Sequence, residues 1–155
     1  MAPRLKAWSD ILDGLHKEIY AVVEPLTDAQ INWAHPHLAN TVGILLRHIA
    51  GSERYWIGEV AGGHPAHRNR AAEFVREPLK KAPLIDGLRD AQTQSRRVID
   101  ALTDADLADE VEVSMGGRSG SVTKGWALLH ALEHTSYHLG QLKLFHKMAT
   151  AGKDP

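Results

Sequence analysis

The 155-residue sequence contains no cysteine and no long uninterrupted run of apolar residues. The lack of cysteine excludes disulfides, thiolate metal sites and a cysteine nucleophile. No segment approaches the ~18 uncharged apolar residues of a transmembrane helix, so no membrane partner is expected. The N-terminal residues lack the apolar stretch of a secretory signal, and we therefore expect a cytoplasmic protein.

The sequence also lacks an excess of charge of either sign. Lysine and arginine number 18 and aspartate and glutamate 19, which gives a net charge of −1. A nucleic-acid partner is therefore not expected. The chain is 43% hydrophobic and 24% charged, as is typical of globular proteins. Its length is that of one ordinary domain, so we predict a single domain over residues 1–155.

Four segments have the spacing of apolar residues that is typical of helices. In the first segment Trp8, Leu12 and Leu15 recur at steps of four and three, which indicates a helix with one buried face. Four such helices of about 20 residues predict an all-α fold, a four-helix bundle. The predicted ranges are about 4–24, from 40 or 41 to 61, 83–102, and from between 121 and 124 to a point before Gly152.

The two long connections between these helices differ in character. Residues 62–82 are polar and long enough to cross the length of a bundle, so the second and third helices either run parallel or form a hairpin. Polar and apolar residues alternate over residues 110–114 (EVEVS), which precede Gly116 and Gly117. This pattern predicts a small β-hairpin before the last helix.

The ten histidines are the unusual feature of the composition. His130, His134 and His138 follow one another at intervals of four on the last predicted helix. Neighbouring members share a helix face about 6 Å apart, so two of them can bind one metal ion. His48 shares a face with Leu45 on the second predicted helix and is a third candidate ligand. The alternative is that each is a core histidine bonded to a neighbour.

A metal ion would remove two physical difficulties of clustered buried histidines. Each buried imidazole without a partner costs about 1–3 kcal/mol, and protonating adjacent imidazoles places like charges together. A divalent cation avoids both because neutral imidazole is the ligand form. Three imidazoles leave coordination positions for water or substrate. They suit Zn, Ni or Fe, so the identity of the metal stays open.

Two segments resemble the DinB/YfiT-like superfamily, namely residues 41–53 (TVGILLRHIAGSE) and 130–141 (HALEHTSYHLGQ). The resemblance extends over the whole chain in order and length. It implies a metal-binding four-helix bundle with an up-down-down-up helix order, commonly dimeric. It also aligns His48, His134 and His138 with the metal ligands and leaves His130 one turn too early.

The resemblance implies functions that the residues alone do not specify. Our first hypothesis is a metal-dependent enzyme, a thiol S-transferase that uses a low-molecular-weight thiol and acts on a small-molecule substrate. A metal-dependent hydrolase and a non-catalytic, stress-associated metal-binding protein are the alternatives. A homodimer is expected.

Other residues near the candidate ligands are expected to line a pocket or to support the ligands. These residues are Tyr55, Trp56, His130, Tyr137 and Gln141.

Several charged or polar residues near these segments are not expected to be metal ligands. Glu53 and Glu133 point away from the candidate ligands on their helices, so we expect them in solvent or behind the ligands. We expect His64 and His67 in a solvated loop. The basic residues from Arg68 to Lys81 are expected on a solvated surface.

Overall fold

The computed structural model describes residues 2–115 and 118–151. This part of the chain is mostly helical and carries a small two-stranded sheet. The long helical segments are α1 (Pro3–Val23), α3 (Val42–Glu53) with its π-helical continuation η1 (Arg54–Ala61), α5 (Lys81–Ala101) and α6 (Lys124–Thr150). The short elements are α2 (Asp28–Ile31), α4 (Arg70–Glu73) and the 3₁₀ turn η2 (Asp106–Ala108).

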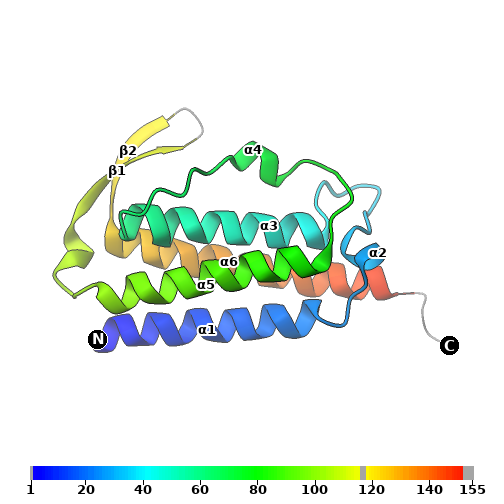
Figure 1. Cartoon of the computed structure of the whole chain (residues 1–155), viewed down its shortest axis with the longest axis horizontal. Helices are drawn as coiled ribbons and strands as arrows, with labels where there is room; N and C mark the ends of the chain where they lie inside the picture. The colour runs from blue at the N-terminus through cyan, green and yellow to red at the C-terminus, as the bar shows by residue number, and fades with distance from the viewer. Residues whose placement is uncertain (1, 116–117, 152–155) are drawn as a thin grey trace.

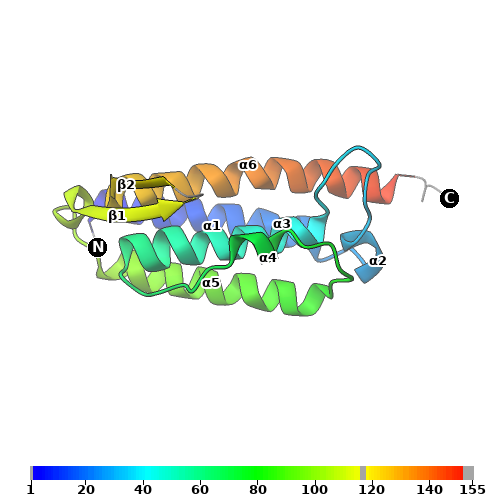
Figure 2. The same ribbon diagram turned by 90° about the horizontal axis from the view of Figure 1, so that it is seen from above.

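The four long helical segments lie side by side and do not simply alternate in direction (Figure 1). Helices α1 and α6 run one way, whereas α3 and α5 run the other way. The connection that carries α4 makes this possible, since it passes back over α3 along the length of the molecule (Figure 2). Of the two predicted arrangements for residues 62–82, the structure has the parallel one. Contacts join α1 to α6 and α5, and α3 to α5 and α6.

Threonine side chains define the starts of α3 and α6. The Thr41 hydroxyl accepts a hydrogen bond from the backbone N–H of Ile44 at 3.2 Å, and the Thr123 hydroxyl accepts one from Trp126 at 3.1 Å. These N-caps satisfy backbone donors that have no partner within the helix. The predicted starts were therefore close to the observed ones. Helix α6 ends at Thr150, and Gly152 lies outside the described residues.

The predicted hairpin is present as strands β1 (Glu110–Met115) and β2 (Arg118–Thr123). The strands are antiparallel, with Val111 opposite Val122. The two glycines predicted for its turn lie outside the described residues. Val111, Val113 and Val122 pack against the apolar cluster around η1 and α6. This contact supplies the burial that an isolated pair of strands lacks.

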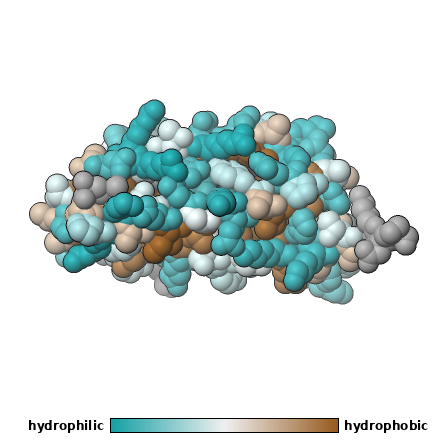
Figure 3. Space-filling view, turned by 90° about the horizontal axis from the view of Figure 1, so that it is seen from below, coloured by the Kyte–Doolittle hydropathy of each residue, from teal (hydrophilic) through white to brown (hydrophobic). Residues whose placement is uncertain are grey.

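The helices enclose two apolar clusters. One cluster includes Ile49, Leu88 and Leu142, and the other includes Leu12 and Leu128. On the face seen from below Figure 1, hydrophobic residues form separate areas among hydrophilic ones (Figure 3). Within the described part of the chain, no helix combines the length and the apolar character needed to cross a bilayer.

Glu53 is buried in the interior, which corrects the expectation that it lies in solvent or behind the ligands. Its side chain is inaccessible to solvent, and its carboxylate accepts hydrogen bonds from His16 Nε2 and from the Ser95 hydroxyl, both at 2.7 Å. The physical reason is that α3 packs against α5 as well as α6, so the face opposite His48 is also buried. The angle between Glu53 and His48 around the helix axis therefore did not predict whether the Glu53 side chain is exposed.

Replacing Leu88 by alanine is expected to lower the free energy of unfolding by about 2–5 kcal/mol. Leu88 is fully buried on α5, so the change leaves a cavity in the first apolar cluster. Urea unfolding followed by circular dichroism measures the loss. Leu38, between α2 and α3, is 39% exposed and gives the matched control, for which Leu38→Ala should change stability by less than about 1 kcal/mol. Equal losses in the two variants would contradict the assignment of the core.

Candidate metal centre

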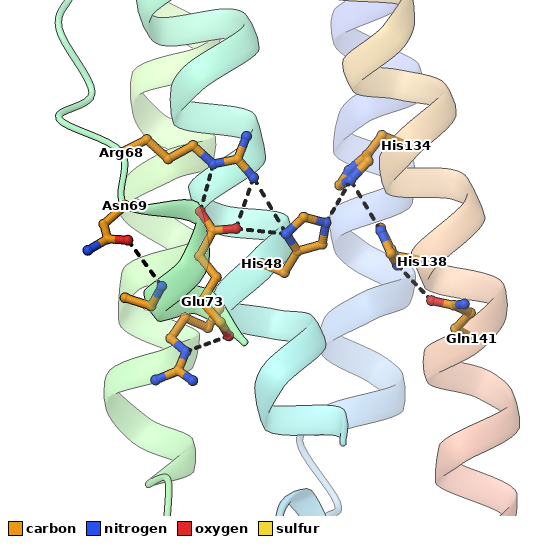
Figure 4. Close-up of polar contacts among 9 residues, drawn as sticks. His48, Arg68, Asn69, Glu73, His134, His138 and Gln141 are labelled. Atoms are coloured by element: carbon orange, nitrogen blue, oxygen red, sulfur yellow. Dashed lines mark hydrogen bonds and ion pairs between the residues drawn. The ribbon is translucent and has the colours of Figure 1, made fainter. Parts of the chain in front are cut away.

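The Nε2 atoms of His48, His134 and His138 converge between α3 and α6 (Figure 4). His134 Nε2 lies 2.9 Å from His48 Nε2 and 3.1 Å from His138 Nε2. All three atoms lie within 4.8 Å of one another. Nitrogen ligands at about 2.0–2.1 Å from a tetrahedral ion are themselves ~3.3 Å apart, so the spacing is close to that of a metal site.

Hydrogen bonds at Nδ1 hold the rings of His48 and His138 so that their Nε2 atoms face the other histidines. His48 Nδ1 donates to Glu73 Oε2 and His138 Nδ1 donates to Gln141 Oε1, each at 2.7 Å. A neutral imidazole has one N–H, so both Nε2 atoms present a lone pair. His134 Nε2 carries at most one hydrogen for its two short contacts. A cation among the three nitrogens satisfies every lone pair, and this donor set therefore fits a divalent transition metal.

His134 and His138 are held in the neutral form that a metal ion requires. Burial, followed by the proximity of His138 and His48, lowers the pKa of His134 to about 3. Burial also lowers the pKa of His138, against the opposing effect of its hydrogen bond to Gln141. Near neutral pH His134 is consequently not protonated, and the lowered pKa of His138 favours the neutral form that binds an ion.

Glu73, at the end of α4, supports His48 from the side opposite the other histidines (Figure 4). Its carboxylate also accepts two hydrogen bonds from Arg68, from Nε at 2.6 Å and from a terminal nitrogen at 2.9 Å. Burial raises the pKa of Glu73, but the hydrogen bonds from Arg68 and His48 outweigh burial and lower it below its ordinary value. An ionised carboxylate that accepts a hydrogen bond from the ring nitrogen not bound to metal orients the imidazole and increases its basicity as a ligand.

Glu73 was not predicted to contact the site, and the prediction that Arg68 lies on a solvated surface is wrong. The Arg68 side chain is only 9% exposed, because the connection between η1 and α5 folds down onto α3. The contact depends on Gly51, where a Cβ atom would lie 2.2 Å from Glu73 Oε1. Gly51 follows His48 by three residues and therefore shares its face. A glycine at this position was the available signal that a side chain approaches the helix there.

His130 lies beside the three convergent histidines and is not one of them. Its ring stacks on Trp126 with a centroid distance of 4.9 Å and an interplanar angle of 7°. Trp56 meets the same ring edge-on at 4.8 Å, and the His134 ring is 6.0 Å away. His130, Trp56 and Trp126 thus form an aromatic wall one helical turn before His134.

The other expected neighbours divide into two groups. Gln141 contacts His138 directly and donates a hydrogen bond to the Tyr137 hydroxyl at 3.1 Å, and Tyr137 is 63% exposed. Tyr55 instead packs against Trp56 at 5.0 Å and lies under the Arg68 guanidinium at 5.7 Å. Tyr55 therefore supports the surroundings of the site rather than a ligand.

The remaining expectations concern exposed residues. The Glu133 side chain is 82% exposed, so this carboxylate faces solvent. His64 and His67 lie exposed in the segment between η1 and α4. Each of these three residues is thus where the sequence analysis expected it.

The fold and the site define a helical protein with a triad of histidines contributed by two helices, of which His48 and His138 are buried and His134 is partly buried. The sequence profile of the DinB superfamily matches residues 11–142, and the chain therefore belongs to this superfamily.

A solved structure, the conserved protein of locus from Enterococcus faecalis, is similar to this chain. The TM-score is 0.72 at 17% sequence identity, over 96% of this chain and 98% of that chain. At this identity the likeness concerns the fold alone. A search of curated proteins finds no match.

Replacing Glu73 by glutamine is expected to weaken metal binding by about 10- to 100-fold, because the outer partner of His48 loses its charge. Isothermal titration with Zn²⁺ or Ni²⁺ measures the change. Glu133→Gln removes an exposed carboxylate beside His134 on the same helix and serves as the matched control. An affinity that is the same in both variants would show that Glu73 does not support a metal ligand.

The metal-free protein is expected to lose stability in acid partly through His134. Its pKa of about 3 in the folded state lies below the ordinary value of 6.5, so the unfolded chain binds the proton more tightly. The stabilising contribution is complete above about pH 6.5 and is lost as the pH falls towards about 3. The loss of unfolding free energy between about pH 7 and about pH 4.5 should be smaller in His134→Gln than in the parent. His64→Gln, an exposed control, should behave as the parent does; a parent-like loss in His134→Gln would contradict the prediction.

Proposed function

We propose that the protein is a metal-dependent enzyme that holds one divalent transition metal ion, Zn, Ni or Fe, through His48, His134 and His138. The observation that carries this proposal is the convergence of three Nε2 atoms with two short contacts at His134. Neutral histidines that merely fill a core would each have a separate hydrogen-bond partner. Here His48 and His138 each use Nδ1 to bind Glu73 or Gln141, and the lone pairs on their Nε2 atoms point toward His134.

The proposed reaction is the attack of a low-molecular-weight thiol on an electrophilic carbon of a small organic acceptor. The thiol loses its S–H proton to water, the new S–C bond forms, and the acceptor's leaving group departs with the electron pair of the bond that breaks. A bound divalent ion supplies a Lewis acid that lowers the pKa of a thiol or water molecule. Glu73 and Gln141 hold two of the ligating rings in place. Trp126 and Tyr137 are 47% and 63% exposed. Trp126 contacts His130 and Tyr137 contacts His138, with ring centroids 4.9 and 5.1 Å apart, so both offer apolar surface to the acceptor.

We also infer that the long helices form the up-down-down-up four-helix bundle of the superfamily and that the protein is a homodimer. The directions of α1, α3, α5 and α6 support the bundle. Helices α1 and α6 pack against each other and carry exposed apolar side chains, which a second copy of the chain would cover. These side chains are Ile11 on α1 and Leu129 and Leu144 on α6.

Metal analysis of natively purified protein tests the ligand set. The parent is expected to contain stoichiometric metal, and His48→Ala and His138→Ala are expected to lose it, because two imidazoles bind an ion far more weakly than three. His130→Ala should retain the metal, since its ring belongs to the aromatic wall. Unchanged metal in either ligand variant would remove that residue from the site.

The loaded parent is then assayed against a panel of thiols with electrophilic acceptors, and separately against amides and esters. Turnover in the first panel that is lost in His48→Ala supports the S-transferase. Turnover confined to the second panel would indicate a hydrolase instead. No turnover in either panel, together with a large fall in melting temperature on metal removal, would indicate a metal ion with a structural role.

A further inference from the structure

A cavity of about 480 Å³ lies between α3 and the connection that carries α4. Arg47, Gly51 and Arg54 form its helical wall, and Arg68 and Glu73 form part of the opposite wall. Figure 2 shows this connection passing over α3. The volume lies within the ~300–1,000 Å³ of typical small-molecule sites. The proposed metal ligands are not among the residues that line the cavity.

The charged groups of the cavity do not balance. Its lining contains three arginines and two glutamates. Glu73 pairs with Arg68 at 2.6 Å, and Glu77 pairs with Arg47 at 2.5 Å. Within the described residues the Arg54 side chain has no carboxylate within 4.0 Å, and its one side-chain hydrogen bond goes to the backbone carbonyl of Gly87 at 2.5 Å. The cavity therefore has one guanidinium charge without a counter-charge.

The arginines differ in the hydrogen-bond donors that they have left. Arg47 uses all three of its nitrogens, on the Glu73 and Val75 carbonyl oxygens and on the Glu77 carboxylate. Arg54 is half-buried and uses one nitrogen on Gly87. Arg68 uses Nε and one terminal nitrogen on Glu73. Arg54 and Arg68 each retain at least one nitrogen without a hydrogen-bond partner, whereas every side-chain nitrogen of Arg47 already has a partner in the wall.

We propose that this cavity binds a small oxyanion, a carboxylate or a phosphate group, through Arg54 and Arg68. A guanidinium presents paired N–H donors that match two oxygens of either group. Salt screens a half-buried charge less than an exposed one, so the attraction persists at ordinary ionic strength. The anion supplies the counter-charge that Arg54 lacks.

This anion site is separate from the proposed metal site. In Figure 4 Arg68 and Glu73 lie on one side of His48, and His134 and His138 lie on the other. Glu73 stands between the cavity and the His48 ring and hydrogen-bonds to both Arg68 and His48. An anion in the cavity is therefore not a ligand of the metal, and its binding does not depend on the metal.

Calorimetric titration of the metal-free protein with inorganic phosphate, and separately with malonate, tests the proposal at constant ionic strength. At least one probe should bind, and Arg54→Gln should weaken that binding at least about tenfold. Arg54→Lys, which keeps the charge but lacks the paired donors, should give an intermediate affinity. Arg4→Gln removes an exposed arginine of α1 and should bind as the parent does. The probe that binds tells a phosphate site from a carboxylate site.

In the titration of the metal-free protein, the proposal is overturned by binding of neither probe, by equal binding in the parent and Arg54→Gln, or by equal weakening in Arg4→Gln. Circular dichroism of each variant establishes that a loss is not due to unfolding. His134→Ala should keep the parent's affinity for the anion. His134→Ala distinguishes the two sites, because it removes a proposed metal ligand and should leave the affinity for the anion unchanged. Binding that appears only after metal loading would place the anion on the metal and would also overturn the proposal.

Discussion

The short contact between the His48 and His134 imidazoles is the constraint around which the site is built. These rings come from α3 and α6 and bring two nitrogens within 2.9 Å inside the protein. Burial makes protonation of His134 costly. The hydrogen on His48 Nδ1 is already donated to Glu73. Such a contact is stable only when a hydrogen or a cation lies between the nitrogens, and His138 adds a third nitrogen to the same place.

The path of the chain between η1 and α5 connects the fold to this constraint. Because α3 and α5 run in the same direction, the chain has to return over the full length of α3. On the way it brings Arg68 and Glu73 onto His48 and forms the outer wall of the arginine-lined cavity. The same topological feature therefore orients a histidine and creates a separate charged cavity. Residue 51 has to be glycine for Glu73 to approach this closely.

Periodicity predicted the long helices and the histidine spacing because both are local properties of the chain. Steps of three and four identify a helix face whatever that helix packs against. The path of residues 62–80 has no such period and depends on contacts with α3, so Glu73 and Arg68 could not be assigned to the site. Glu53 was misjudged for a related reason, since a helix with two buried faces gives no simple relation between angle and exposure.

The chain contains a second buried pair of histidine and carboxylate, and comparing the pairs shows what makes the first a candidate ligand. His16 and Glu53 also lie 2.7 Å apart and are fully buried. There, however, Nε2 is the nitrogen that contacts the carboxylate, and Nδ1 faces the Tyr20 hydroxyl at 3.4 Å. His48 instead bonds its carboxylate through Nδ1 and turns Nε2 toward two other imidazoles. A carboxylate partner is thus common to both histidines, and the group that meets the other ring nitrogen separates a core residue from a candidate metal ligand.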